Sequence, residues 1–413
     1  MSTDVRSELS LFDVPTAQTA IKETVVESLY PACTPTDSCI DFELRGTREN
    51  YLDLNDTLLY VKFTLKPPKD YVPTHAMVAS KSCFLENLPI ASLFSKVSVY
   101  LNDTLVDGFD DLYPYRAMLL SLLHTTENEK SSVMRGWGYE DDDAKRQAWM
   151  DVKETTFEFE GPLFGDVFRQ AQLLPPLVDL RLRMTRNPPS FYQRALLVGG
   201  EKKQCLTWEC VLEKVCLKVK RVRVHPEIYQ SHSLGLMRHK AYYPLDRTRL
   251  QSFIIPKESK KYIINNFLPG PSPKSIMVAM VKDKTVLYND PFKFEPFHLE
   301  SITLFVDGVA QSYEADFEKN LYVQPYVELY KNALVNDCGI TWSKYKTDKC
   351  LFYFNLAPDF DPNNIQPLNH RNLRLELRFA KALDENIKLV MLTRSDDVMI
   401  IDKSLRVSII SNP

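Results

Sequence analysis

Hydrophobic and polar residues alternate along much of the chain with a period of two positions. In the segment 40–44, Ile40, Phe42 and Leu44 alternate with Asp41 and Glu43. That period places apolar side chains on one face of a strand and polar side chains on the other. The pattern predicts strands over 40–44, 60–65, 97–101, 157–160, 180–184, 215–224, 373–379 and 405–410.

Turn signals rich in proline, glycine and asparagine separate these predicted strands. Examples are Pro67-Pro68, Asp107-Gly108 and Asp307-Gly308. Many short strands joined by such turns are typical of β-sandwiches and barrels, whereas alternating strands and helices would indicate a parallel sheet. Helices are predicted only over 115–124 and 326–333, and each directly follows a proline.

These two helices belong to a pattern that occurs twice. In the first half, the strand 97–101 leads through an Asp-Gly turn to Pro114-Tyr115 and an apolar helix. In the second half, 302–306 leads through an Asp-Gly turn to Pro325-Tyr326 and another helix, so that prolines 114 and 325 are 211 positions apart. Internal repeats at a fixed order indicate a duplicated structural unit.

Further pairs of segments follow in the same order. The strand 179–184 resembles 372–377, the strand 58–63 resembles 275–280, and the closing strand 217–224 resembles 405–410. Chance similarity between strands of alternating apolar and charged residues is the alternative explanation. Duplication gives units of roughly 190 residues, a size that suits an eight-stranded jelly roll with long loops.

The sequence therefore predicts an all-β protein of two tandem eight-stranded antiparallel jelly-roll barrels with long loops and short helices. The predicted organisation is an N-terminal arm over 1–35, a first jelly roll over 36–226 and a second jelly roll over 227–413.

Composition excludes several classes of protein. The 413 residues carry 51 Lys and Arg against 54 Asp and Glu, a net charge of −3, so the chain lacks the basic excess that neutralises phosphates in a nucleic-acid-binding protein. Only 12 residues are glycine, whereas phosphate-binding loops and doubly wound nucleotide folds need glycine at their turns. At 44% hydrophobic and 25% charged, the chain is globular.

No secretion signal or membrane span is expected. Charged residues interrupt the first 30 positions, and the longest apolar runs, such as 117–123, are far shorter than the roughly 18 residues that cross a bilayer. The eight cysteines are therefore expected to be reduced thiols of an intracellular protein. On one predicted strand, Cys210 and Cys216 are an even number apart and are expected to face the same side.

Two stretches resemble a known family. The segment 8–19, ELSLFDVPTAQT, is similar to the amino terminus of the major capsid proteins of Polinton/Maverick elements and adintoviruses. The segments 223–228, RVHPEI, and 239–244, HKAYYP, are similar to a central part of the same proteins. The family more often has Pro-Pro-Thr-Gln-Thr where this chain has Pro15-Thr16-Ala17-Gln18-Thr19. The resemblance covers nearly the whole chain.

The resemblance implies a double jelly-roll protein with both barrels upright in a shell. Three copies would form a pseudo-hexagonal homotrimeric capsomer, and capsomers would form an icosahedral capsid around double-stranded DNA without sequence-specific binding. It also implies penton and minor capsid proteins as partners and the virion as the location, after synthesis in the host cytoplasm. Self-assembly, not chemistry, would be the function.

No catalytic, cofactor-binding or metal site is predicted from the residues. Nucleophile-elbow, phosphate-loop and zinc-protease motifs are all missing from the sequence. Cys205, Cys210 and Cys216 have spacings of five and six, which fit no zinc knuckle. The acidic run 140–143 has two interpretations, a divalent-cation site or a solvated loop.

Two regions are predicted to contact other chains. The arm carries Leu11, Phe12 and Val14 among charges and cannot fold alone, so we expect it to bind a neighbour or an inner shell protein. The polar insertion 125–151 would rise to the outer surface, where aromatic residues are candidate interface anchors. These are Trp137, Tyr139 and Trp149, and the alternative is that they fix the insertion to its own barrel.

Fold alone does not determine function. A jelly-roll protein that binds carbohydrate or processes glycosides therefore stays open as an alternative, as does a host protein derived from a captured capsid gene.

Overall fold

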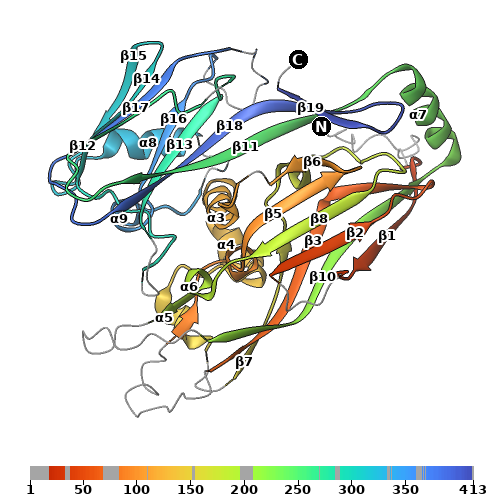
Figure 1. Cartoon of the computed structure of the whole chain (residues 1–413), viewed down its shortest axis with the longest axis horizontal. Coiled ribbons are helices and arrows are strands. Elements are labelled where there is room, and N and C mark those ends of the chain that lie inside the picture. The colour runs from red at the N-terminus through yellow and green to blue at the C-terminus, as the bar shows by residue number, and fades with distance from the viewer. Residues whose placement is uncertain are drawn as a thin grey trace, which may run out of the picture.

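The computed structural model describes most of the chain. The described residues are 18–32, 38–67, 83–108, 110–150, 154–195, 208–268, 270–283, 289–332, 335, 337–359, 365, 367 and 369–411. Figure 1 shows two β-barrels lying side by side, the first coloured red to green and the second green to blue.

The first barrel consists of two four-stranded antiparallel sheets. One sheet has the strand order β1-β10-β3-β7 and the other has the order β2-β8-β5-β6. A short pair, β4 and β9, lies beside them. The strands are β1 (Ile21–Leu29), β2 (Cys39–Leu44), β3 (Asn50–Lys66), β4 (Cys83–Leu85), β5 (Phe94–Leu101), β6 (Thr104–Asp107), β7 (Thr155–Pro162), β8 (Leu180–Arg186), β9 (Gln193–Ala195) and β10 (Glu209–Val224).

The second barrel repeats this arrangement. Its sheets have the orders β11-β18-β13-β16, with β19 added beside β18, and β12-β17-β14-β15. The strands are β11 (Ala241–Ile255), β12 (Lys261–Asn265), β13 (Ser275–Lys282), β14 (Leu299–Val306), β15 (Val309–Glu314), β16 (Leu351–Asn355), β17 (Leu373–Phe379), β18 (Ile387–Ile401) and β19 (Val407–Ser411).

The strand order defines the fold of each unit. When the small β4–β9 pair and β19 are set aside, the described residues of each unit form eight strands, and the sheets join them as 1-8-3-6 and 2-7-4-5. This order, with the first strand beside the last, is that of a jelly roll. The all-β prediction of two tandem jelly rolls is confirmed.

Short helices fill the connections. They are α2 (Pro89–Ser92), α3 (Tyr113–His124), α4 (Glu127–Ser131), η1 (Val133–Trp137), α5 (Asp143–Ala148), η2 (Asp166–Arg169), α6 (Pro189–Tyr192), α7 (Pro226–Arg238), α8 (Val323–Asn332) and α9 (Trp342–Thr347). The two predicted helices are α3 and α8. Both begin slightly earlier than predicted, because proline is well tolerated in the first helical turn. No helix in the described part of the chain is long and apolar enough to cross a membrane.

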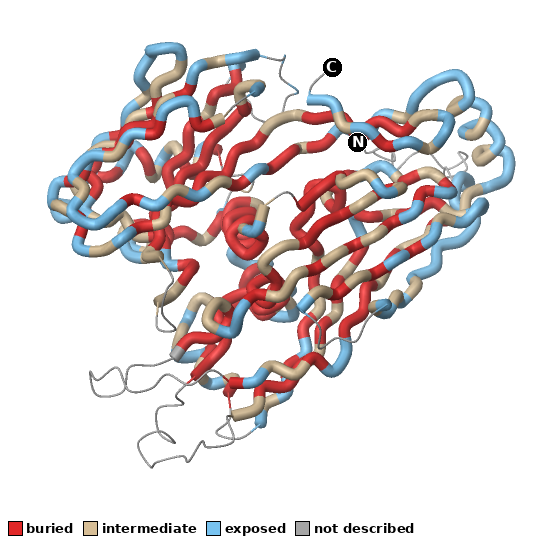
Figure 2. Tube along the Cα trace, in the orientation of Figure 1, coloured by how far each residue is buried: buried red, intermediate tan, exposed pale blue. Residues whose placement is uncertain are grey.

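The core follows the inner faces of the sheets (Figure 2). From Leu59 to Phe63 of β3, buried positions alternate with half-buried ones, and the next two positions, Thr64 and Leu65, are both buried. Burial of one such apolar side chain stabilises the folded state by roughly 1.5–3 kcal/mol. Strand β13 differs, because Ile276–Val281 are all buried and both of its faces are covered.

Three predictions are corrected by the strand pairing. Residues 21–29, assigned to the arm, form β1 and pair with β10, so the first barrel begins inside the predicted arm. β1 is an edge strand exposed on both faces, which removes the alternation that identifies a strand. The counterpart of β10 is β18, not the segment 405–410, which lies at β19.

The third correction concerns the cysteines. A β-bulge between Leu212 and Lys214 inserts one extra residue into β10. Cys210 lies opposite Leu65, on the inner face, whereas Cys216 lies opposite Tyr60, on the outer face. The bulge therefore places the two thiols on opposite sides of the sheet. The six described cysteines form no disulfide bond; Cys33 and Cys205 lie outside the described residues.

Candidate functional site

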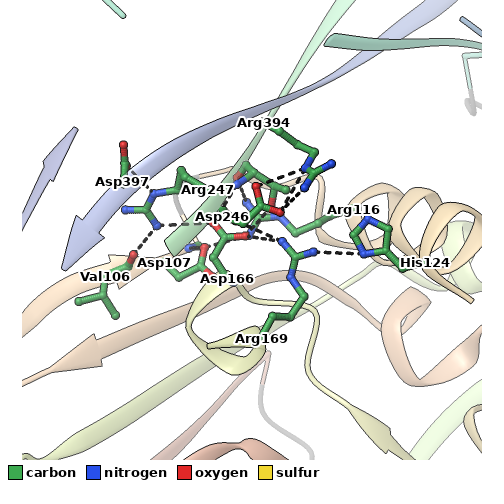
Figure 3. A network of polar contacts seen from close by, with 12 residues as sticks. Val106, Asp107, Arg116, His124, Asp166, Arg169, Asp246, Arg247, Arg394 and Asp397 are labelled. Carbon is green, nitrogen blue, oxygen red and sulfur yellow. Dashed lines mark hydrogen bonds and ion pairs between the residues drawn. The ribbon is translucent and has the colours of Figure 1, made fainter. Parts of the chain in front are cut away.

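The contact between the two barrels contains a largely buried network of ionisable side chains. The first barrel contributes β6, α3 and η2 to it, and the second contributes β11 and β18. Figure 3 shows the network from close by, with side chains from both barrels pointing toward one another. We call it the inter-barrel network. Its members are Asp107, Arg116, His124, Asp166, Arg169, Asp246, Arg247, Arg394 and Asp397.

Arg116, on the first turn of α3, joins the two barrels directly. Its guanidinium donates to Asp107 at 2.8 Å and to Asp110 at 3.1 Å within the first barrel. It also donates to the backbone carbonyl oxygen of Thr248 on β11 at 3.1 Å. Burial opposes the charge of Arg116, but the neighbouring carboxylates outweigh burial and raise its pKa. Arg116 is therefore a fixed cation in the interface.

Asp166, in η2 of the first barrel, forms hydrogen bonds with Thr248 of the second barrel. Its carboxylate accepts hydrogen bonds from the backbone N–H of Thr248 at 3.0 Å and from the Thr248 hydroxyl at 2.5 Å. Its own N–H donates to Asp107 at 2.5 Å. Burial and the nearby carboxylate of Asp107 raise the pKa of Asp166.

Arg247, on β11, extends the network toward β18 and β6. It pairs with Asp397 at 3.1 Å and donates to the carbonyl oxygen of Val106 at 2.6 Å. Arg247 and Asp397 lie on neighbouring strands of the second barrel and are almost fully buried, so removing either side chain would weaken the charge balance of the other. Arg247 also lies 3.6 Å from Asp166 of the first barrel, and this ion pair crosses the contact.

Asp246 lies between two cations of the second barrel. It accepts from Arg394 at 2.8 Å and lies 3.2 Å from Lys274. Burial alone would raise the pKa of Asp246, but Arg394 and Lys274 outweigh burial and lower the pKa to about 2.

His124 ends α3 and faces cations from both barrels. Its Nδ1 lies 3.4 Å from Nη1 of Arg169. Since a guanidinium can only donate, Nδ1 must accept, and the imidazole is neutral with its proton on Nε2. Burial, then the charges of Arg169 and Arg394, lower the pKa of His124 to about 3.

The insertion between α3 and β7 makes a second set of inter-barrel contacts. It folds into α4, η1 and α5; α4 begins at a capping box of Thr126 and Glu129. Asp141 lies 3.4 Å from Lys344 and 3.3 Å from Lys349 of the second barrel. Burial opposes the charge of Asp141, but the two lysines hold its pKa below the ordinary range.

The acidic run is only partly solvated: Asp142 is exposed, whereas its neighbours are held in ion pairs. Glu140 is buried and pairs with Arg135, and Asp143 pairs with Arg146 and Arg194. Arg194 also reaches Asp290 of the second barrel at 2.9 Å. Within the described residues, no group of three or more His, Cys, Asp or Glu side chains could hold a metal ion.

The comparisons with known proteins concern the fold. No family model matches the chain, and no curated protein sequence matches it. Solved structures do match. A chain in the cryo-electron microscopy structure of the Sputnik virophage is 12% identical, with a TM-score of 0.68, over 100% of this chain and 93% of that chain.

Two viral major capsid proteins match over similar lengths. The mavirus protein is 11% identical, with a TM-score of 0.57, over 97% of this chain and 93% of its own. The Faustovirus protein is 10% identical, with a TM-score of 0.57, over 94% of this chain and 92% of its own. The chain has the double jelly-roll fold. Because both barrels match together, the match includes the placement of one jelly roll against the other.

In the double jelly roll, the predicted interface aromatics pack on their own barrel. Tyr139 is 3% exposed. The Trp137 ring lies edge-on to Phe164, with centroids 6.3 Å apart, and the Trp149 ring lies 6.4 Å from that of Phe159. Trp137 and Trp149 remain partly exposed, so their role as contacts between chains stays a prediction. Leu11, Phe12 and Val14 lie outside the described residues.

Sequence reasoning missed the inter-barrel network. Its members are separated by up to 290 positions, from Asp107 to Asp397, and no local spacing connects them. One signal was present: Arg116 directly precedes the apolar run 117–120, where a charge must find a buried partner.

Proposed function

We propose that the protein is a major capsid protein that assembles as a homotrimeric, pseudo-hexagonal capsomer in an icosahedral shell around double-stranded DNA. The match over both barrels supports this proposal, because the mavirus and Faustovirus proteins that it resembles are major capsid proteins. Two similar barrels in each of three copies give six similar units, which suit a hexagonal lattice. The proposed role is structural, with the virion capsid as its location and penton and minor capsid proteins as further partners.

The purified chain is expected to have the mass of three copies in solution. Mass photometry over a range of concentrations measures that mass, and negative-stain microscopy should show particles of hexagonal outline. A chain that stays monomeric at every concentration, without hexagonal particles, would contradict the proposal and favour the carbohydrate-binding alternative. A glycan array would then test that alternative.

The arm is proposed to act in assembly beyond the trimer. Deleting residues 2–17 ends the deletion before β1, which begins at Ile21, so the pairing of β1 with β10 is retained. We expect the trimer mass to be unchanged and the yield of closed particles to fall at least about tenfold, because a segment that orders on contact contributes only when its partner is present. Particle yield is measured by sedimentation and electron microscopy, and an unchanged yield would refute this role.

A further inference from the structure

Helices α3 and α8 occupy equivalent places in the two barrels but differ in burial. In α3, every residue except His124 is buried, because the second barrel and the neighbouring helices cover it (Figure 1). In α8, only Pro325, Leu329 and Asn332 are buried. The side of the second barrel that corresponds to the covered side of the first is therefore open.

The repeat identifies which residue of α8 replaces the interface cation. The Pro-Tyr pairs at 114 and 325 align α3 with α8, and the offset of 211 places Val327 at the position of Arg116. Arg116 is 3% exposed, whereas Val327 is 40% exposed and Val323, one turn earlier, is 58% exposed. We call Val323 and Val327 the α8 ridge.

The strand ladders identify the equivalent of the surface that Arg116 contacts. Aligning Leu58 of β3 with Ser275 of β13 aligns their opposite residues, Lys218 and Arg394. The next strand of each sheet pairs with these residues in turn. Ser28 of β1 lies opposite Lys218, and Thr248 of β11 lies opposite Arg394. Ser28 is thus the counterpart of Thr248.

Two positions before this pair, Val26 is the counterpart of Asp246. Val26 is 60% exposed and Val25 is 51% exposed, although both are apolar. Because neighbouring side chains of a strand point to opposite faces, Val25 lies on the other face from Val26. We call the exposed apolar position Val26 the β1 strip. The α8 ridge and the β1 strip are therefore the exposed, apolar counterparts of two charged surfaces that meet inside the chain.

We infer that the α8 ridge of one copy packs against the β1 strip of a second copy, in the relation that joins α3 to β11 within one chain. This inference rests on the proposed function, since it takes the partner to be another copy. A head-to-tail contact between different surfaces forms a ring when its rotation closes. Repeating the inter-barrel relation from chain to chain would make such a ring.

The change from charged to apolar residues has a physical reason. Arg116 and Asp246 fold together with their partners and are never left unpaired in the folded chain. Surfaces that join two copies are exposed to water before assembly. When they come together, water must leave the contact and no charged side chain may be left buried without a partner. Valine meets both requirements.

Lysine substitutions test the contact. Val327→Lys and Val26→Lys, made separately, each place one charge in the proposed interface, and lysine is well tolerated on an exposed helix and on an edge strand. We expect each variant to weaken trimer formation at least about 100-fold by mass photometry. Leu234→Lys on α7, at an apolar side chain that is 52% exposed, is the matched control and should leave the trimer unchanged.

Mixing the two variants makes the test specific. A Val26→Lys chain still has a native α8 ridge, and a Val327→Lys chain still has a native β1 strip, so the mixture contains one native interface and should form pairs of chains. Two results would overturn the inference and leave the proposed function standing. Both single variants could form trimers as readily as the wild type, or the two variants could fail to pair when mixed. A wild-type chain that is monomeric at every concentration would overturn both.

Discussion

Replacing Arg116 with methionine is expected to lower the free energy of unfolding by about 3–5 kcal/mol. The substitution keeps much of the side-chain volume but removes the cation that contacts Asp107, Asp110 and the carbonyl oxygen of Thr248. Asp107 is almost fully buried, and it would be left with an uncompensated negative charge. Urea denaturation followed by near-ultraviolet circular dichroism measures the loss.

A matched control separates burial from ion pairing as such. Arg183 makes a two-pronged pair with Asp41 at 2.8 and 3.0 Å, but its side chain is 43% exposed. Arg183→Met should therefore cost less than about 1 kcal/mol. Equal losses in the two variants would contradict the structural role given to the inter-barrel network.

A double variant tests the source of the penalty. Asp107→Asn removes the negative charge and keeps one side-chain oxygen, which can accept from the N–H of Gly108 or of Asp166 but not from both, because the two groups bond to different carboxylate oxygens. If the cost of Arg116→Met arises from an unpaired buried charge, adding Asp107→Asn should recover part of the lost stability. A double variant less stable than Arg116→Met alone would indicate that the hydrogen bonds matter more than the charge.

The parts of the fold that were predictable have one face in the core and one in solvent. The predicted strands 180–184 and 373–379 lie within β8 and β17, where buried and less buried positions largely alternate. Strand β13 shows no alternation, because its residues from Ser275 to Val281 are buried on both faces of the strand. Its neighbour β18 is buried along most of its length and was missed for the same reason.

A helix that is exposed on all sides was also not predicted. Helix α7, which joins the barrels, has no buried residue, so no apolar stripe indicates it. The pairing of Asp166 with Thr248 depends on how two complete barrels dock, which no short segment encodes. The repeat was the one long-range signal in the sequence, and it supplied the equivalence of Arg116 and Val327.

Acid is expected to weaken the folded chain through His124. Its pKa is lowered from 6.5 to about 3, so the folded state binds the proton less readily than the unfolded state. Stability from this group is therefore complete above about pH 6.5 and is lost as the pH falls toward 3. At 1.36 kcal/mol per pH unit, the loss between pH 6.5 and pH 4 is about 3 kcal/mol.

His124→Asn removes this titration while keeping a side-chain oxygen that can accept from Arg169. We expect the variant to lose about 3 kcal/mol less than the wild type between pH 7 and pH 4. The lowered pKa of Asp246 makes its own contribution fade mainly between about pH 4 and 2, below this window. The raised pKa of Asp166 acts in the opposite direction, since its contribution is present at low pH and is lost as the pH rises, but it is common to both proteins and cancels in the difference. Parallel stability curves for wild type and variant, measured by urea denaturation at each pH, would show that His124 is not the acid-sensitive group.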